Sequence, residues 1–141
     1  MFAALPLLAL PVALYNLAAL ATMPGGLQSV IADDRMAQRL FVLPMASGGN
    51  WAVTLGDLII FVSLGILFIE LLKSTTSRRV VIVNHSLSMI LFIVCLVEFL
   101  LFRAFATSAF FLLTSMVLLD VLAGFIVTIV ASRRDIDVVG G

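Results

Sequence analysis

The chain has 141 residues, of which 63% are hydrophobic and 11% are charged, and its formal net charge is zero. Soluble domains are about 45–50% apolar and about 25% charged, so this composition excludes an ordinary water-soluble core and predicts an integral membrane protein. Eight basic and eight acidic residues, with no basic patch, exclude nucleic acid as a partner. A lone cysteine, Cys95, excludes an intrachain disulfide.

Four apolar runs follow one another, and each is long enough to cross a hydrocarbon core of roughly 30 Å as a helix. They cover residues 2–21, 51–72, 80–102 and 105–131. The short connections after the second and third runs make neighbouring helices antiparallel. The sequence therefore predicts an all-α membrane protein, a single domain over residues 1–141 in which four transmembrane helices form an antiparallel bundle.

The first run is the weakest helix of the four, because Pro6 and Pro11 interrupt its backbone hydrogen bonding. A cleaved signal peptide is the alternative interpretation, since Ala19-Leu20-Ala21 fits the small-residue cleavage pattern. No Lys or Arg precedes the apolar stretch, however, and a signal peptide normally begins with a positive region. We therefore expect the run to be retained as a membrane helix.

One long connection, residues 22–50, forms the predicted outer loop. Apolar residues recur in it at roughly helical spacing, which favours a short amphipathic helix on the membrane surface over an irregular loop. Basic residues set the orientation, because they gather on the cytoplasmic side. Five of them flank the ends of spans two, three and four on one side: Lys73, Arg78, Arg79, Arg133 and Arg134.

Three basic residues fall on the other side: Arg35, Arg39 and Arg103. This five-to-three imbalance predicts a multi-pass protein of a bacterial inner membrane with both termini in the cytoplasm. Trp51 would then lie at the outer interface, where an indole ring is favoured. The expected partners are membrane lipids and other membrane-protein subunits, or further copies of the chain.

Five ionisable side chains fall inside the apolar runs, where a charge costs roughly 2.5–3.5 kcal/mol on insertion scales. They are Asp57, Glu70, His85, Glu98 and Asp120. Asp57 and Glu98 come at similar depth near the outer ends of their spans, and Arg103 is close enough in sequence to pair with either carboxylate. Such a pair is either a structural ion pair or one half of a proton path. Glu70 precedes Lys73 by three residues and is interpreted as interfacial.

Asp120 lies near the middle of the fourth run, with Gly124 and Thr128 following on the same helical face. Small residues permit close helix contact, so we expect this face to point into the bundle or against a partner. His85 of the third run is a candidate partner for Asp120, as a buried hydrogen-bonded pair or as part of a proton relay. His85 as a haem or pigment ligand is a lesser alternative, because there is no second histidine.

Three segments resemble parts of small uncharacterised four-span inner-membrane proteins of alphaproteobacteria. They are Trp51-Ala52-Val53-Thr54-Leu55-Gly56-Asp57, Val97-Glu98-Phe99-Leu100 and Asp120-Val121-Leu122-Ala123-Gly124-Phe125. The resemblance runs from about Trp51 to Arg134 and implies a bacterial inner membrane and a four-helix layout. It implies no catalytic residue.

The sequence carries no recognisable nucleotide, zinc or nucleophile motif, so we predict no catalytic residue, no metal site and no cofactor beyond lipid. The favoured function is a non-enzymatic structural or accessory subunit of a larger inner-membrane complex. An ion or proton transport component that uses the intramembrane carboxylates is the main alternative. A membrane enzyme acting on lipid or quinone, and a pigment or haem protein, are further classes that these residues support less well.

Overall fold

The computed structural model describes residues 5–73 and 78–139, leaving aside the side chains of residues 78–82 and 131–139. The expected helix start at residues 2–4 and most of the connection after Lys73 therefore lie outside the described residues. The side chains of four arginines used to predict the orientation also lie outside the description: Arg78, Arg79, Arg133 and Arg134. The described chain is mostly helical, with one β-hairpin. Its elements in order are α1 (Ala9–Thr22), η2 (Gly26–Gln28), α2 (Ala32–Met36), β1 (Arg39–Pro44), β2 (Asn50–Thr54), α3 (Leu55–Lys73), α4 (Arg78–Leu101), η3 (Arg103–Phe105) and α5 (Ser108–Val139).

Three helices are long and apolar enough to cross a membrane, and they indicate a membrane protein. The apolar stretches are Leu55–Lys73, Val83–Leu101 and Ser108–Val130, with mean hydropathies of 2.3, 1.9 and 2.4. They correspond to the second, third and fourth predicted spans. The last helix begins at Ser108 and continues to Val139, beyond its expected end at residue 131. Thr107 caps it, because the Phe110 amide donates to Thr107 Oγ1 at 3.1 Å.

The first span differs from the prediction, because a regular helix begins only at Ala9. The described residues before it form a turn, in which the Ala9 amide donates to the Pro6 carbonyl at 3.1 Å. Pro6 and Pro11 have no amide hydrogen, so a continuous helical ladder cannot form through this segment. The remaining helix of 14 residues measures about 21 Å, which is shorter than a hydrocarbon core.

The predicted outer loop is where the all-α expectation was wrong. Residues expected to be loop or the start of the second span form an antiparallel hairpin, in which Phe41 pairs with Val53 and Leu43 with Trp51. The turn between the strands uses Gly48 with a φ of +83°, a conformation that favours glycine. A half-buried strand is normally recognised by alternating apolar and polar residues. The alternation could not be seen here, because the residues on both faces of the hairpin are largely apolar.

The expected amphipathic helix shrinks to α2, five residues long. Its apolar side chains, Ala32 and Met36, are buried against the protein core, while Asp33, Asp34 and Arg35 are exposed. Leu40 and Phe41, two of the apolar residues of the predicted outer loop, belong to β1 instead. This helix therefore packs onto the helical core rather than presenting an apolar stripe outwards.

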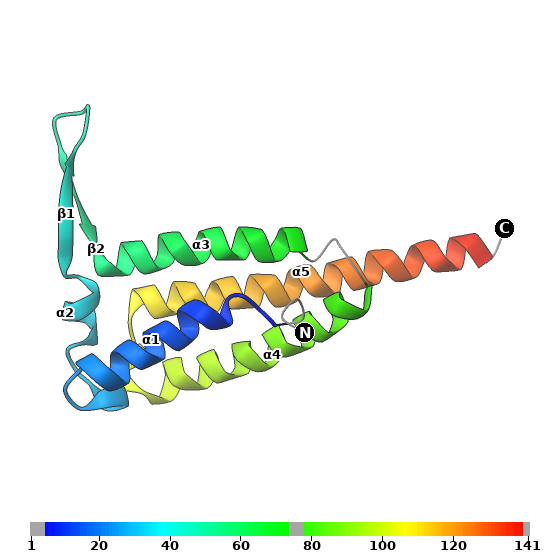
Figure 1. Cartoon of the computed structure of the whole chain (residues 1–141), viewed down its shortest axis with the longest axis horizontal. Coiled ribbons are helices and arrows are strands. Elements are labelled where there is room, and N and C mark those ends of the chain that lie inside the picture. The colour runs from blue at the N-terminus through cyan, green and yellow to red at the C-terminus, as the bar shows by residue number, and fades with distance from the viewer. Residues whose placement is uncertain (1–4, 74–77, 140–141) are drawn as a thin grey trace.

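The long helices pack around α5, which contacts both α3 and α4. The chain runs away from the hairpin end along α3, returns along α4 and runs out again along α5 (Figure 1). Helix α1 lies against α3 and α4. Apolar side chains from all four meet in one core, with Leu67 of α3, Cys95 of α4 and Leu113 and Val117 of α5 among its most buried members.

Candidate functional site

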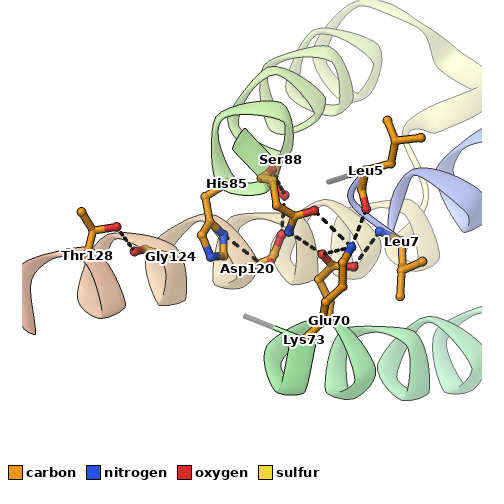
Figure 2. A network of polar contacts seen from close by, with 10 residues as sticks. Leu5, Leu7, Glu70, Lys73, His85, Ser88, Asp120, Gly124 and Thr128 are labelled. Atoms are coloured by element: carbon orange, nitrogen blue, oxygen red, sulfur yellow. Dashed lines mark hydrogen bonds and ion pairs between the residues drawn. The ribbon is translucent and has the colours of Figure 1, made fainter. Parts of the chain in front are cut away.

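A cluster of polar side chains lies where the end of α3, the start of α4 and the middle of α5 meet (Figure 2). Its centre is Glu70, whose side chain is fully buried. Lys73 Nζ lies 3.3 Å from Glu70 Oε1, and Asn84 Nδ2 donates to the same oxygen. Lys73 Nζ also donates to Asn84 Oδ1 at 3.3 Å. Glu70 is therefore a buried member of this network, beside the cationic Lys73 as its position near the end of the span suggested.

The same two charged side chains hold the non-helical start of the chain. The Leu7 amide donates to Glu70 Oε2 at 2.6 Å, and Lys73 Nζ donates to the Leu5 carbonyl at 2.7 Å. These are backbone groups that Pro6 leaves outside a helical ladder. A carboxylate at the start of α1 also interacts favourably with the positive end of the helix dipole. We call Leu5, Leu7, Glu70, Lys73 and Asn84 the N-terminal clamp.

Ser88 links the clamp to Asp120. Its hydroxyl lies 3.1 Å from the carbonyl oxygen of Asn84 and 2.5 Å from Asp120 Oδ2. Asp120 is fully buried between α4 and α5, as the small-residue face of α5 led us to expect. His85 Nδ1 lies 3.8 Å from Asp120 Oδ1, too far for a good hydrogen bond. The structure thus brings His85 and Asp120 together, as the sequence suggested, but no hydrogen bond forms between them.

Gly124 is the reason that His85 can lie here. A Cβ atom at position 124 would fall 2.0 Å from Cγ of the imidazole, so the ring occupies the space that any other residue would fill. Thr128, one turn further, donates its hydroxyl to the Gly124 carbonyl at 2.9 Å. The face formed by Asp120, Gly124 and Thr128 therefore packs against α4. The group that lies closest to Gly124 is the His85 side chain, and not the backbone of α4.

Three buried atoms of this region have no hydrogen-bond partner among the described residues: His85 Nδ1, His85 Nε2 and Asp120 Oδ1. His85 also lines a pocket of about 250 Å³ in the groove between α4 and α5. The pocket wall is largely apolar and is formed by His85, Ser86, Met89, Val121, Gly124, Phe125 and Thr128. Buried polar atoms normally have partners, so these three mark the least satisfied part of the cluster.

The remaining predicted residues lie elsewhere. Asp57 is exposed and forms a capping box with Thr54: the Thr54 amide donates to Asp57 Oδ2 at 2.9 Å, and the Asp57 amide donates to Thr54 Oγ1 at 3.2 Å. Its carboxylate is therefore satisfied at the start of its own helix rather than by Arg103, the partner that the sequence suggested. A short polar residue near a helix start has this simpler role, which the Thr54-to-Asp57 spacing could have revealed.

Glu98 is half-buried and accepts a hydrogen bond from Asn16 Nδ2 at 3.2 Å. Arg103 is exposed in η3, and within the described structure it forms no ion pair with either carboxylate. The predicted pairing was wrong, since α4 ends at Leu101 and Arg103 begins η3, so Arg103 does not follow Glu98 on the same helix. Asn16, in the proline-weakened first run, supplies the contact instead.

A second buried contact, at the hairpin end, was missed by the sequence analysis. Tyr15 is 2% exposed, and its hydroxyl donates to the Ala104 carbonyl at 3.1 Å and lies 2.8 Å from Thr107 Oγ1. Its ring packs on Phe105 and Phe110, with centroid separations of 5.5 and 4.8 Å. A lone tyrosine inside an apolar run was the available signal, because a buried phenol needs a partner.

The chemistry open to the cluster is limited by its surroundings. Hydrogen bonds connect Glu70 through Asn84 and Ser88 to Asp120, so these four residues form one continuous polar network at this end of the molecule. Three fully buried apolar residues lie between the cluster and Glu98 in sequence: Val117 and Leu113 precede Asp120 on α5, and Cys95 precedes Glu98 on α4. No group of three or more His, Cys, Asp or Glu residues suited to a metal occurs in the part of the chain that the structure describes.

Comparisons of the chain with protein-family models, with curated proteins and with solved structures gave no match.

Proposed function

We propose that the chain is a multi-pass protein of the bacterial inner membrane that acts as a non-enzymatic structural or accessory subunit of a larger complex. In this proposal the N-terminal segment is a fourth crossing, completing an antiparallel four-helix bundle with both termini in the cytoplasm. Support comes from the clamp, because Glu70 and Lys73 satisfy the backbone groups of Leu7 and Leu5. Backbone groups outside a helical ladder are tolerated at membrane depth when other groups of the protein satisfy their hydrogen bonds.

The observation that most favours a subunit role is the hairpin. It projects sideways from the ends of the helices, across the direction of α3 (Figure 1). If α3 crosses the bilayer, the hairpin extends along the membrane surface beyond the footprint of its own helices. Its apolar side chains are exposed, among them Phe41, Leu43 and Trp51. An isolated two-stranded hairpin is marginally stable in water, so a neighbour that covers it would stabilise it.

The proposed neighbour is another membrane-protein subunit that lies beside the helices and contacts the face carrying Phe41, Leu43 and Trp51. These residues share one face because Leu43 pairs with Trp51, and residues two apart on a strand point the same way. The cores of protein interfaces are enriched in aromatic residues and depleted of charged ones. This face fits that pattern, because it carries Phe41 and Trp51 and no charged residue. Further copies of the chain and lipid alone are the competing occupants.

Site-specific photocrosslinking tests this proposal. A photoreactive p-benzoylphenylalanine replaces Leu43 of the hairpin in one sample and Leu64 of α3 in a control, since both side chains are exposed apolar residues. We expect one protein adduct of defined mass from position 43 and only lipid adducts from position 64. Adducts of the chain with itself would indicate a homo-oligomer, and lipid adducts alone at both positions would refute the subunit proposal.

A face-selective substitution sharpens the same test. Phe41→Thr combined with Leu43→Thr should abolish the adducted complex in mild detergent, because it removes two apolar contacts while placing β-branched residues, which suit a strand, at both positions. Val42→Thr, on the opposite face, is the matched control and should leave the complex intact. Equal loss in both variants would show that hairpin stability, and not the aromatic face, controls the association.

Ion or proton transport is the second candidate, and the continuous polar route from Lys73 to Asp120 favours it. The apolar layer of Leu113, Val117 and Cys95 favours the subunit role, since a conducting path would have to cross it. A transport role predicts a flux driven by a pH gradient in liposomes that falls in the Asp120→Asn variant. Folded protein that gives no flux above empty liposomes would eliminate this candidate.

A further inference from the structure

The register of the hairpin shows which of its backbone groups point outwards. In an antiparallel pair, directly opposed residues alternate between hydrogen-bonded and non-hydrogen-bonded pairs. The Met45 amide donates to the Gly49 carbonyl at 2.8 Å, so these two residues form a hydrogen-bonded pair beside the turn. Three positions further along the strands, Val42 and Ala52 therefore form a non-hydrogen-bonded pair. The amide and carbonyl groups of Val42 and Ala52 thus point away from the partner strand.

The outer edge of β1 is poorly suited to pairing with another strand. Pro44 is also in a non-hydrogen-bonded pair, and its nitrogen, which points outwards, carries no hydrogen to donate. At the other end of the strand, a shift in register between Arg39 and Phe41 interrupts the regular ladder. Proline and bulges are two features that prevent an edge strand from pairing with a further chain. Val42 is left as the outward donor in the regular part of β1.

The outer edge of β2 is open. This strand, Asn50–Thr54, contains no proline and no charged residue, and the extra residue of the register shift lies in β1. Thr54 uses its amide within the chain, because that group donates to Asp57 Oδ2 at 2.9 Å. On the same edge, the amide and carbonyl groups of Asn50 and Ala52 have no hydrogen-bond partner in the described part of the chain. Most of the hairpin projects beyond the helices, so a further strand can reach these groups (Figure 1).

Donors and acceptors that recur along an extended strand are matched by another extended backbone. A strand added to β2 would exchange hydrogen bonds with Asn50 and Ala52 and would continue the face that carries Trp51. It would also convert a marginally stable hairpin into a sheet of three strands. From this geometry we infer that an extended segment of the neighbouring subunit pairs with the outer edge of β2. The inference rests on the proposed subunit role and adds the way in which the neighbour is held.

Hydrogen exchange at single amides tests the pairing. The complex identified by crosslinking at position 43 is isolated in mild detergent without the crosslinker, and its exchange is compared with that of the chain alone. We expect the Ala52 amide to exchange at least about tenfold more slowly in the complex, because it gains an acceptor. The Val42 amide is the internal control and should exchange at one rate in both samples. An Ala52 amide that exchanges equally fast in both samples overturns the inference, as does a Val42 amide that is slowed as much as Ala52.

Two proline variants supply the second measurement. Ala52→Pro replaces the outward amide hydrogen of β2 with a ring, and Val42→Pro does the same on β1 at the opposed position of the same pair. Pro44 shows that this hairpin accommodates proline at a non-hydrogen-bonded position. We expect Ala52→Pro to recover at least about tenfold less of the neighbouring subunit, and Val42→Pro to recover as much as the unaltered chain does. Equal recovery by the two variants, whether retained or lost, overturns the inference.

The outcomes separate the pairing of β2 from the subunit role on which it rests. If position 43 gives no protein adduct, both the subunit role and the edge pairing are refuted. If the adduct forms and persists in the Ala52→Pro variant, the edge pairing alone is refuted, and the face that carries Phe41, Leu43 and Trp51 remains as the contact.

Discussion

The two ends of the N-terminal segment are held to the helices in different ways. At the hairpin end, where α1 is a regular helix, Tyr15 packs among Phe105 and Phe110 and needs only its hydroxyl satisfied. At the other end, where Pro6 interrupts the helix, a buried carboxylate and an ammonium group bind the backbone directly. The contrast shows that a satisfied helix needs only apolar packing, whereas a broken one requires polar side chains as substitutes for its missing ladder.

The largest effect is expected from Glu70→Ala, which removes the centre of the clamp. Lys73 loses its counter-ion and the Leu7 amide loses its acceptor in a part-buried site. Removing one partner of a buried ion pair typically costs about 3–5 kcal/mol, and the lower limit of this range applies here because Lys73 is 20% exposed. We expect a loss of that size in the free energy of unfolding, measured by denaturation in mixed detergent micelles, together with faster hydrogen exchange at the Leu7 amide.

Two variants make this test specific to the clamp. Glu70→Gln keeps an acceptor oxygen for the Leu7 amide and should retain a larger share of the stability than Glu70→Ala does. Glu98→Gln alters a half-buried carboxylate that contacts only Asn16 at the other end of α4, and it should cost far less. A Glu70→Ala protein as stable as the Glu98→Gln protein would mean that the broken helix does not need the clamp.

A smaller loss is expected from Gly124→Ala, at the edge of the polar end. The added Cβ would overlap the His85 ring, because the distance to its Cγ atom would be 2.0 Å. Overpacking of this kind costs about 1–3 kcal/mol. Gly65→Ala in α3 is the matched control, since no atom lies within 4 Å of its added Cβ, and alanine should be neutral or stabilising there. Equal stability of the two variants, measured as before, would contradict the close contact.

The difference between the two ends also explains what could be read from the sequence. Hydropathy located the three long helices, because a helix that crosses lipid needs apolar side chains along its whole length. Asp120, Gly124 and His85 could be grouped because helical periodicity puts the first two on one face. The role of Glu70 could not be predicted, since its partner Leu7 lies more than sixty residues away in the sequence. The hairpin was hidden because apolar residues on both of its faces look like the start of a helix.

The aromatic end should respond more mildly, as Tyr15→Phe can show. The ring and its contacts with Phe105 and Phe110 remain, while the Ala104 carbonyl and Thr107 Oγ1 lose the hydroxyl. Leaving a buried acceptor unpaired costs about 1–3 kcal/mol, and Thr107 can still accept from the Phe110 amide. We expect a loss of about 1–2 kcal/mol, clearly below that of Glu70→Ala. A larger loss than in the clamp variant would reverse the comparison.

The smallest effect is expected outside both ends, from Thr54→Ala in the capping box of α3. The variant removes the hydroxyl that accepts from the Asp57 amide and donates to Asp57 Oδ2 at 2.8 Å. Loss of a helix cap typically costs about 1 kcal/mol, and exposed Asp57 can turn to water instead. Thr54→Ser keeps the hydroxyl and should recover most of the stability. Thr54→Ala could instead cost as much free energy of unfolding as Glu70→Ala. The exposed Asp57 cap would then stabilise the helices as much as the buried Glu70 carboxylate does, and burial would not indicate which acidic residues stabilise this protein.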